Sequence, residues 1–120
     1  MKFIQMSGYT VKVGQEEAHQ KWLIENEERI RKAAPPGGKY IGTFAAVLSS
    51  EKGAGAYRVL WELDSYGAMD AGAAAAKDPD GEWRKLGGEM SKFIDPDWNL
   101  PHSNELLKNV VEATIWDPQT

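Results

Sequence analysis

The chain has 120 residues, of which 42% are apolar and 27% charged, with a formal net charge of -4 and a pI near 5.2. This length predicts one domain over residues 1–120, and the acidic balance argues against a partner that is a nucleic acid or an anionic membrane. The absence of cysteine excludes disulfides, thiolate nucleophiles and cysteine-ligated metals. No stretch approaches the roughly 20 apolar residues of a membrane span, and the start lacks the apolar block of a signal peptide, so we expect a cytoplasmic protein.

The chain opens with a strand pattern over residues 2–13. The apolar positions in it change from even to odd numbers at Gly8, which predicts a glycine bulge there. Residues 15–34 form the longest predicted helix, acidic in its first turn and basic in its last, as the helix dipole prefers. Pro35 and Pro36 end this helix, because proline cannot continue it.

Three more strands and a broken helix follow. Residues 40–48 are apolar at even and odd positions alike, which predicts a strand buried on both faces. A polar loop at 49–55 leads into a third strand, 56–64, antiparallel to the second. A helical segment comes next and is interrupted at 78–81, and residues 106–116 read as the fourth strand.

This order predicts an α+β fold of the ferredoxin-like βαββαβ type, with a four-stranded antiparallel sheet and its helices on one face. The other face then has no cover within the monomer. On the third and fourth strands it would carry both apolar and charged residues, namely Arg58, Leu60, Glu62, Lys108, Val110, Glu112 and Trp116. A second copy is the simplest cover, so we expect a homodimer through the open sheet face.

With this order of elements, the chain resembles the dimeric α+β barrel superfamily of ferredoxin-like proteins. Within it the chain is similar to NIPSNAP-like proteins and to the antibiotic-biosynthesis monooxygenase and stress-responsive barrel families. The likeness rests on residues 9–14 (YTVKVG), Gly42, residues 59–65 (VLWELDS) and residues 78–83 (DPDGEW). It covers about residues 5–116, although the break before Trp83 is longer than is usual in these families. The resemblance implies a dimer whose sheets form a shared barrel, with a pocket between sheet and helices in each subunit.

The inward stripe of the first predicted helix carries His19, Trp22 and Asn26, which could line that pocket together. A neutral imidazole beside an amide and an indole can position a phenol or a polyketide-like molecule and move a proton, as a cofactor-free oxygenation requires. His19 is therefore the candidate proton mover and Asn26 the orienting amide, with Trp22, Tyr9 and Trp61 as substrate-binding walls. The alternative, which we favour because helix-edge histidines are common, leaves His19 half exposed at the helix boundary.

Other features point less directly to chemistry. Haem-degrading members of the superfamily use a helix histidine with an Asn and a Trp nearby, but residues 66–94 contain no histidine. We expect no cofactor, and two isolated histidines predict no metal site. His102, in a loop near the expected pocket mouth, is either a lid base or, more simply, solvated. Gly87-Gly88 weakens the last helix by about 1–2 kcal/mol relative to alanine, which predicts close packing against a strand or a partner.

Two functions remain open from the sequence. One is a cofactor-independent monooxygenase or isomerase acting on an aromatic or polyketide-like molecule. The other is a non-catalytic dimeric module, concerned with binding or stress, whose pocket holds an apolar metabolite.

Overall fold

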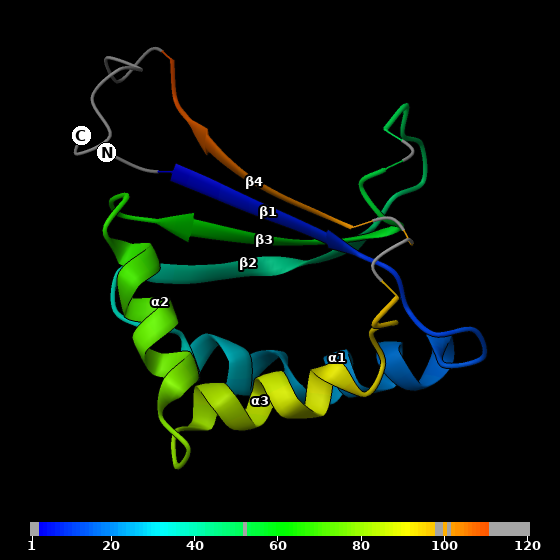
Figure 1. Ribbon diagram of the computed structural model, residues 1–120, viewed down its shortest axis with the longest axis horizontal. Coiled ribbons are helices and arrows are strands. Elements are labelled where there is room, and N and C mark those ends of the chain that lie inside the picture. Colours follow the sequence, from blue (N-terminus) through cyan, green and yellow to red (C-terminus); the bar gives the residue numbers. More distant parts are fainter. Residues whose placement is uncertain (1–2, 52, 98–99, 101, 111–120) are drawn as a thin grey trace.

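The computed structural model describes residues 3–51, 53–97, 100 and 102–110 (Figure 1). The elements run in the order β1 (Phe3–Tyr9), α1 (Glu16–Ala33), β2 (Gly38–Ala45), β3 (Tyr57–Leu63), α2 (Ala68–Lys77), α3 (Glu82–Ser91) and β4 (Ser103–Lys108). This is the predicted order, with the second helical segment divided at 78–81 as expected. The fourth strand begins earlier than predicted, at Ser103, and ends at Lys108, so the predicted continuation through 109–110 is wrong; the rest of it, 111–116, lies outside the described residues.

The described strands form one antiparallel sheet in the order β2-β3-β1-β4. The three helices of the described residues lie on one face of this sheet, and no described element covers the opposite face (Figure 1). The predicted α+β ferredoxin-like fold is thereby confirmed.

The ends of α1 follow from its sequence. Glu16 and Glu17 stand in its first turn and a basic pair in its last, which suits the helix dipole. Ala34 then takes an extended conformation, with φ -54° and ψ 131°. The residue before a proline is driven out of the helical region by the proline ring, so the chain turns away at Pro35.

The bulge predicted at Gly8 is wrong. The pairing of β1 with β3 runs without a shift from Phe3 to Tyr9, and Gly8 lies opposite Arg58. Glycine is needed for another reason, because a Cβ at this position would lie 1.7 Å from the carbonyl oxygen of Ala54. The sheet's irregularity lies instead in β2, between Tyr40 and Gly42.

The second strand is shorter than predicted and is not buried on both faces. β2 ends at Ala45, and beyond it the side chains of Val47 and Leu48 are 99% and 95% exposed. The segment that contains them projects as an arm on the open side of the sheet (Figure 1). The apolar residues on the outer face of β2 are themselves exposed, Phe44 by 50%, because no second layer from the described residues covers them.

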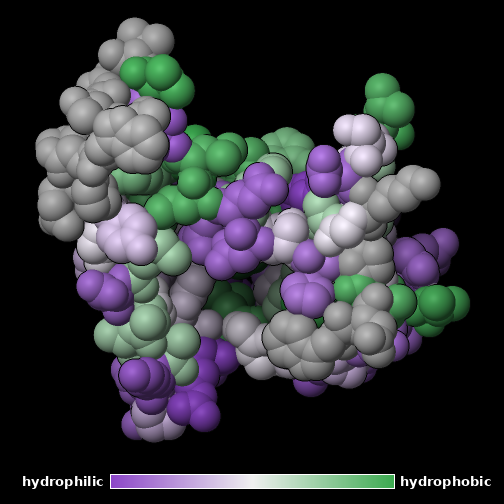
Figure 2. All heavy atoms as spheres, turned by 45° about the horizontal axis from the view of Figure 1, so that its top comes forward, coloured by the Kyte–Doolittle hydropathy of each residue, from purple (hydrophilic) through white to green (hydrophobic). Residues whose placement is uncertain are grey.

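The open face differs in composition from the prediction at β4. Lys108 pairs with Phe3 and holds its Nζ atom 5.6 Å from the centre of that ring, so it lies on the helix side. Leu107 takes its place on the open face, where it pairs with Ile4 and is 48% exposed. Figure 2, in which this face comes forward, shows apolar side chains there among polar ones. Glu112 and Trp116 lie outside the described residues.

The core sits between the sheet and the helices. Ile30 of α1, Tyr40 of β2 and Leu86 of α3 are buried against one another, and the indoles of Trp61 and Trp83 pack around them. Within the described part of the chain, no helix has the length and apolar character needed to cross a membrane.

Candidate ligand cavity

A cavity of about 460 Å³ lies between the sheet and the helices. Its walls come from α1, β2, β3, α2 and α3, and they include the indoles of Trp22, Trp61 and Trp83. The rings of Trp61 and Trp83 meet edge to face with their centres 5.1 Å apart. The size falls in the range of small-molecule sites, which are roughly 300–1,000 Å³. Two of the walls predicted from the sequence, Trp22 and Trp61, are thus brought together here.

The glycine pair of α3 leaves part of this cavity empty. Gly87 lies four residues after Trp83 and three before Met90, so it belongs to the same inward stripe of the helix. A Cβ added at Gly87 or Gly88 would meet no atom within 4 Å. The close packing predicted for this pair is therefore wrong within the chain, and the glycines border open space.

Few polar groups enter the cavity. The Tyr40 hydroxyl and Thr43 Oγ1 share a hydrogen bond of 2.6 Å. Burial raises the pKa of Tyr40, so the phenol stays protonated and can donate. Arg84 also lines the cavity and is exposed, and its Nη1 donates to the Lys77 carbonyl oxygen at 3.4 Å.

His19 is buried, which overturns the half-exposed reading. Its side chain is 1% exposed and packs against the rings of Tyr57 and Phe93, at 4.8 and 6.0 Å between centres. Its Nε2 lies 2.6 Å from the Tyr9 hydroxyl, which donates when the imidazole carries its proton on Nδ1. Burial lowers the pKa of His19 and raises that of Tyr9, so both groups are neutral at pH 7.

The buried pair lies beside the cavity rather than in its wall. His19 borders a second hollow of about 370 Å³ that shares Leu23 and Thr43 with the first. Tyr9, predicted as a wall of the same pocket, borders a third hollow instead, together with His102. The His102 ring is exposed, and its Nδ1 lies 3.0 Å from the Leu100 carbonyl oxygen.

Asn26 does not face the cavity. Its amide nitrogen donates to the Trp22 carbonyl oxygen at 2.8 Å, and its oxygen accepts from Arg29 at 2.8 Å. Arg29 also donates to Glu82 and Glu89 of α3, and Glu89 accepts from the Trp22 indole at 3.1 Å. The hydrogen bond from Arg29, and to a smaller extent that from Trp22, holds the pKa of Glu89 below its usual value.

This polar network ties α1 to α3 along the outer side of the cavity. No local pattern in the sequence indicates this network, because the residues that it joins across the two helices stand 53 to 67 positions apart in the chain. Among the described residues, no group of three or more His, Cys, Asp or Glu side chains could hold a metal ion.

Comparison with known proteins finds similar folds among solved structures. No protein-family model and no curated protein matches the chain. Among solved structures, a NIPSNAP family protein from Agrobacterium tumefaciens is similar, with a TM-score of 0.65 at 14% identity over 96% of this chain and 99% of that one.

Two further structures agree with the first. An uncharacterised NIPSNAP-like domain protein from Burkholderia xenovorans has a TM-score of 0.63 at 12% identity, over 99% and 94% of the two chains. A dimeric ferredoxin-like protein of unknown function from Thermobifida fusca has a TM-score of 0.57 at 16% identity, over 89% and 90%. The chain therefore has the fold of the NIPSNAP and dimeric ferredoxin-like proteins, as the sequence resemblance predicted.

Proposed function

We propose that this protein binds an apolar, ring-bearing small molecule in the cavity between its sheet and helices. The observation that carries the proposal is the cavity wall, in which three indoles surround about 460 Å³ of space. Aromatic rings recognise other flat rings by stacking and edge contacts at low entropic cost. The hydroxyls of Tyr40 and Thr43 then supply a polar contact that fixes orientation.

Tryptophan fluorescence tests this directly, with naphthalene-2-carboxamide as the probe. We expect saturable quenching in the wild-type protein and its loss in Gly87→Leu, which fills the cavity and improves the helix at the same time. Gly72→Leu is the matched control, since it makes the same change in α2 beside a different hollow. Equal binding by the wild type and Gly87→Leu would contradict the proposal.

A second candidate, a cofactor-independent monooxygenase or isomerase, is favoured by the buried pair of His19 and Tyr9. A neutral imidazole hydrogen-bonded to a phenol can accept a proton and pass it on, and the substrate would then lie in the second hollow, which His19 borders. With anthrone as the substrate probe, oxygen uptake measures the monooxygenase reaction. His19→Gln should abolish oxygen uptake while leaving the binding of naphthalene-2-carboxamide unchanged. If the wild type takes up no oxygen, the monooxygenase candidate fails and only the binding function stands.

For the assembly, we propose a homodimer through the open sheet face. Apolar side chains are exposed on this face, Phe44 by 50% and Leu107 by 48%, and a second copy would remove them from water. The dimeric state named for the Thermobifida structure supports this. In sedimentation equilibrium, Leu60→Glu should yield monomers, while Ile24→Glu, on the exposed side of α1, should not. The expected cytoplasmic location stays a prediction.

A further inference from the structure

Arg84 gives the cavity a charge at its edge. It is the one charged side chain among the described residues that line the cavity, and the rest of the wall is aromatic, aliphatic or glycine apart from Tyr40 and Thr43. The chain as a whole is acidic, with a net charge of -4. Arg84 therefore places a positive charge beside an apolar cavity in a protein whose net charge is negative.

The guanidinium of Arg84 has little to hold it within the chain. Its recorded hydrogen bond, to the Lys77 carbonyl oxygen, is 3.4 Å long, and no ion pair to it occurs within the described residues. The carboxylates nearest along α3, those of Glu82 and Glu89, are both occupied by Arg29. Arg84 is thus able to accept an anionic partner from outside the chain.

The position of Arg84 matches the empty part of the cavity. It precedes Gly87 by three residues and Gly88 by four, so all three lie on neighbouring positions of one helix surface. A ring held between the indoles would extend past the glycines toward this guanidinium. The planar fork of arginine pairs best with a planar anion such as a carboxylate, which it can bind through two parallel hydrogen bonds.

We propose that the ligand of this cavity is an aromatic carboxylic acid, whose ring lies among the tryptophans and whose carboxylate pairs with Arg84. This inference rests on the proposed binding function and adds the chemical class of the ligand. It also makes Arg84 the residue that distinguishes an acid from a neutral molecule of the same shape.

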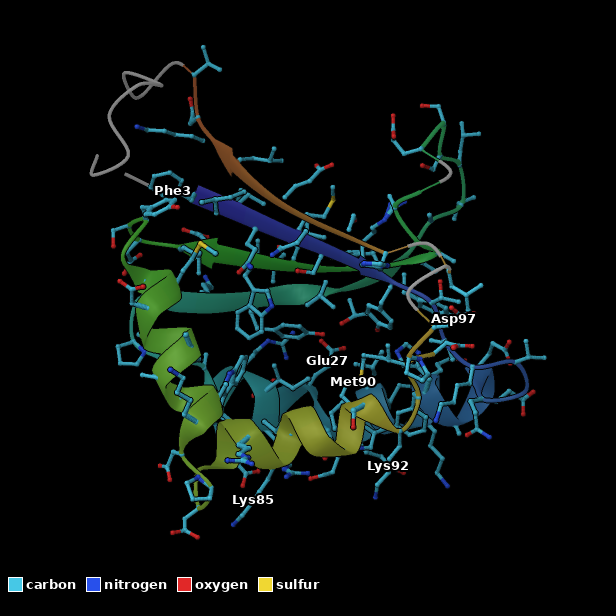
Figure 3. All side chains as sticks on the ribbon, in the orientation of Figure 1. Phe3, Glu27, Lys85, Met90, Lys92 and Asp97 are labelled. Atoms are coloured by element: carbon cyan, nitrogen blue, oxygen red, sulfur yellow. The ribbon has the colours of Figure 1, made fainter. Side chains whose placement is uncertain are left out.

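The test compares 2-naphthoate with naphthalene-2-carboxamide, which has the same ring and a neutral head group. Binding is measured by tryptophan fluorescence at pH 7 and low salt for the wild type, Arg84→Gln and Lys85→Gln. Lys85 is the matched control, because it is the next residue, loses the same charge, and points away from the sheet in Figure 3. Circular dichroism confirms that each variant is folded.

We expect the wild type to bind the carboxylate about two- to fivefold more tightly than the amide, as one solvent-exposed ion pair allows. This preference should vanish in Arg84→Gln and persist in Lys85→Gln. Equal binding of the two probes by the wild type, or an equal preference in Arg84→Gln, would overturn the role of Arg84 but leave the cavity function standing. If neither probe binds the wild type, the cavity function fails and this inference fails with it.

Discussion

Removing the Tyr9 hydroxyl should destabilise the protein more than removing any other tyrosine hydroxyl of the same ring cluster. In Tyr9→Phe the ring stays in place, but His19 Nε2 loses its partner at 2.6 Å inside a site where the imidazole is 1% exposed. Water cannot replace the lost bond easily. The cost combines a hydrogen bond with the desolvation of an unpaired nitrogen, about 1–3 kcal/mol in the free energy of unfolding.

The matched control is Tyr57→Phe. The Tyr57 ring stacks on Tyr9 at 5.7 Å and meets His19 at 4.8 Å, yet the structure records no hydrogen bond for its hydroxyl within the described residues. We expect its loss to change stability by less than about 0.5 kcal/mol. The assay is urea unfolding followed by circular dichroism at one fixed protein concentration, because association would add to the apparent stability. Equal losses in the two variants would refute the reasoning about the buried pair.

Three further outcomes can be measured in the same way. Because burial lowers the pKa of His19 in the folded protein, the unfolded chain binds a proton at this histidine more readily than the folded one does. The free energy of unfolding should therefore be highest above about pH 6.5 and decline below it, and His19→Gln should flatten that decline. Gly8→Ala places a methyl group 1.7 Å from a carbonyl oxygen and should cost more than about 2 kcal/mol, whereas Gly53→Ala, which meets nothing within 4 Å, should be tolerated in urea unfolding. Arg29→Gln unties α1 from α3 and should lower Tm by an amount that shrinks in 1 M NaCl, while Arg31→Gln, whose carboxylate partners lie on its own helix, should have the smaller effect.

The order of strands and helices could be predicted because local patterns determine it. The stop at Pro35 and the break at 78–81 are visible in the sequence and appear in the structure at the same places. The role of Gly8 could not be predicted in this way. Its need for glycine comes from Ala54, a loop residue 46 positions later. The parity change that suggested a bulge is instead a change of face, because Tyr9 is buried on the helix side like Phe3, whereas Ile4 and Met6 lie on the open face.

The candidate site was predicted only in part, because local spacing determines some of its features and distant contacts determine the others. Helical spacing correctly put Trp22 on the inward side of α1, and strand alternation did so for Trp61. Spacing alone gives direction but not depth, so it could not tell a buried His19 from an exposed one. The contribution of Gly87 and the diversion of Asn26 to Arg29 both depend on how α3 is placed against α1. That placement is set by packing over the whole chain.

The edge-to-face contact of Trp61 and Trp83 also gives the cavity an optical signature. Two indoles with centres 5.1 Å apart and planes at 77° couple their electronic transitions, which produces a paired positive and negative band in the far-ultraviolet circular dichroism spectrum. A molecule that wedges the rings apart would weaken this couplet, and one that stacks beside them would leave it in place. The spectrum can therefore report whether and how the cavity is filled without a label and before the natural ligand is identified.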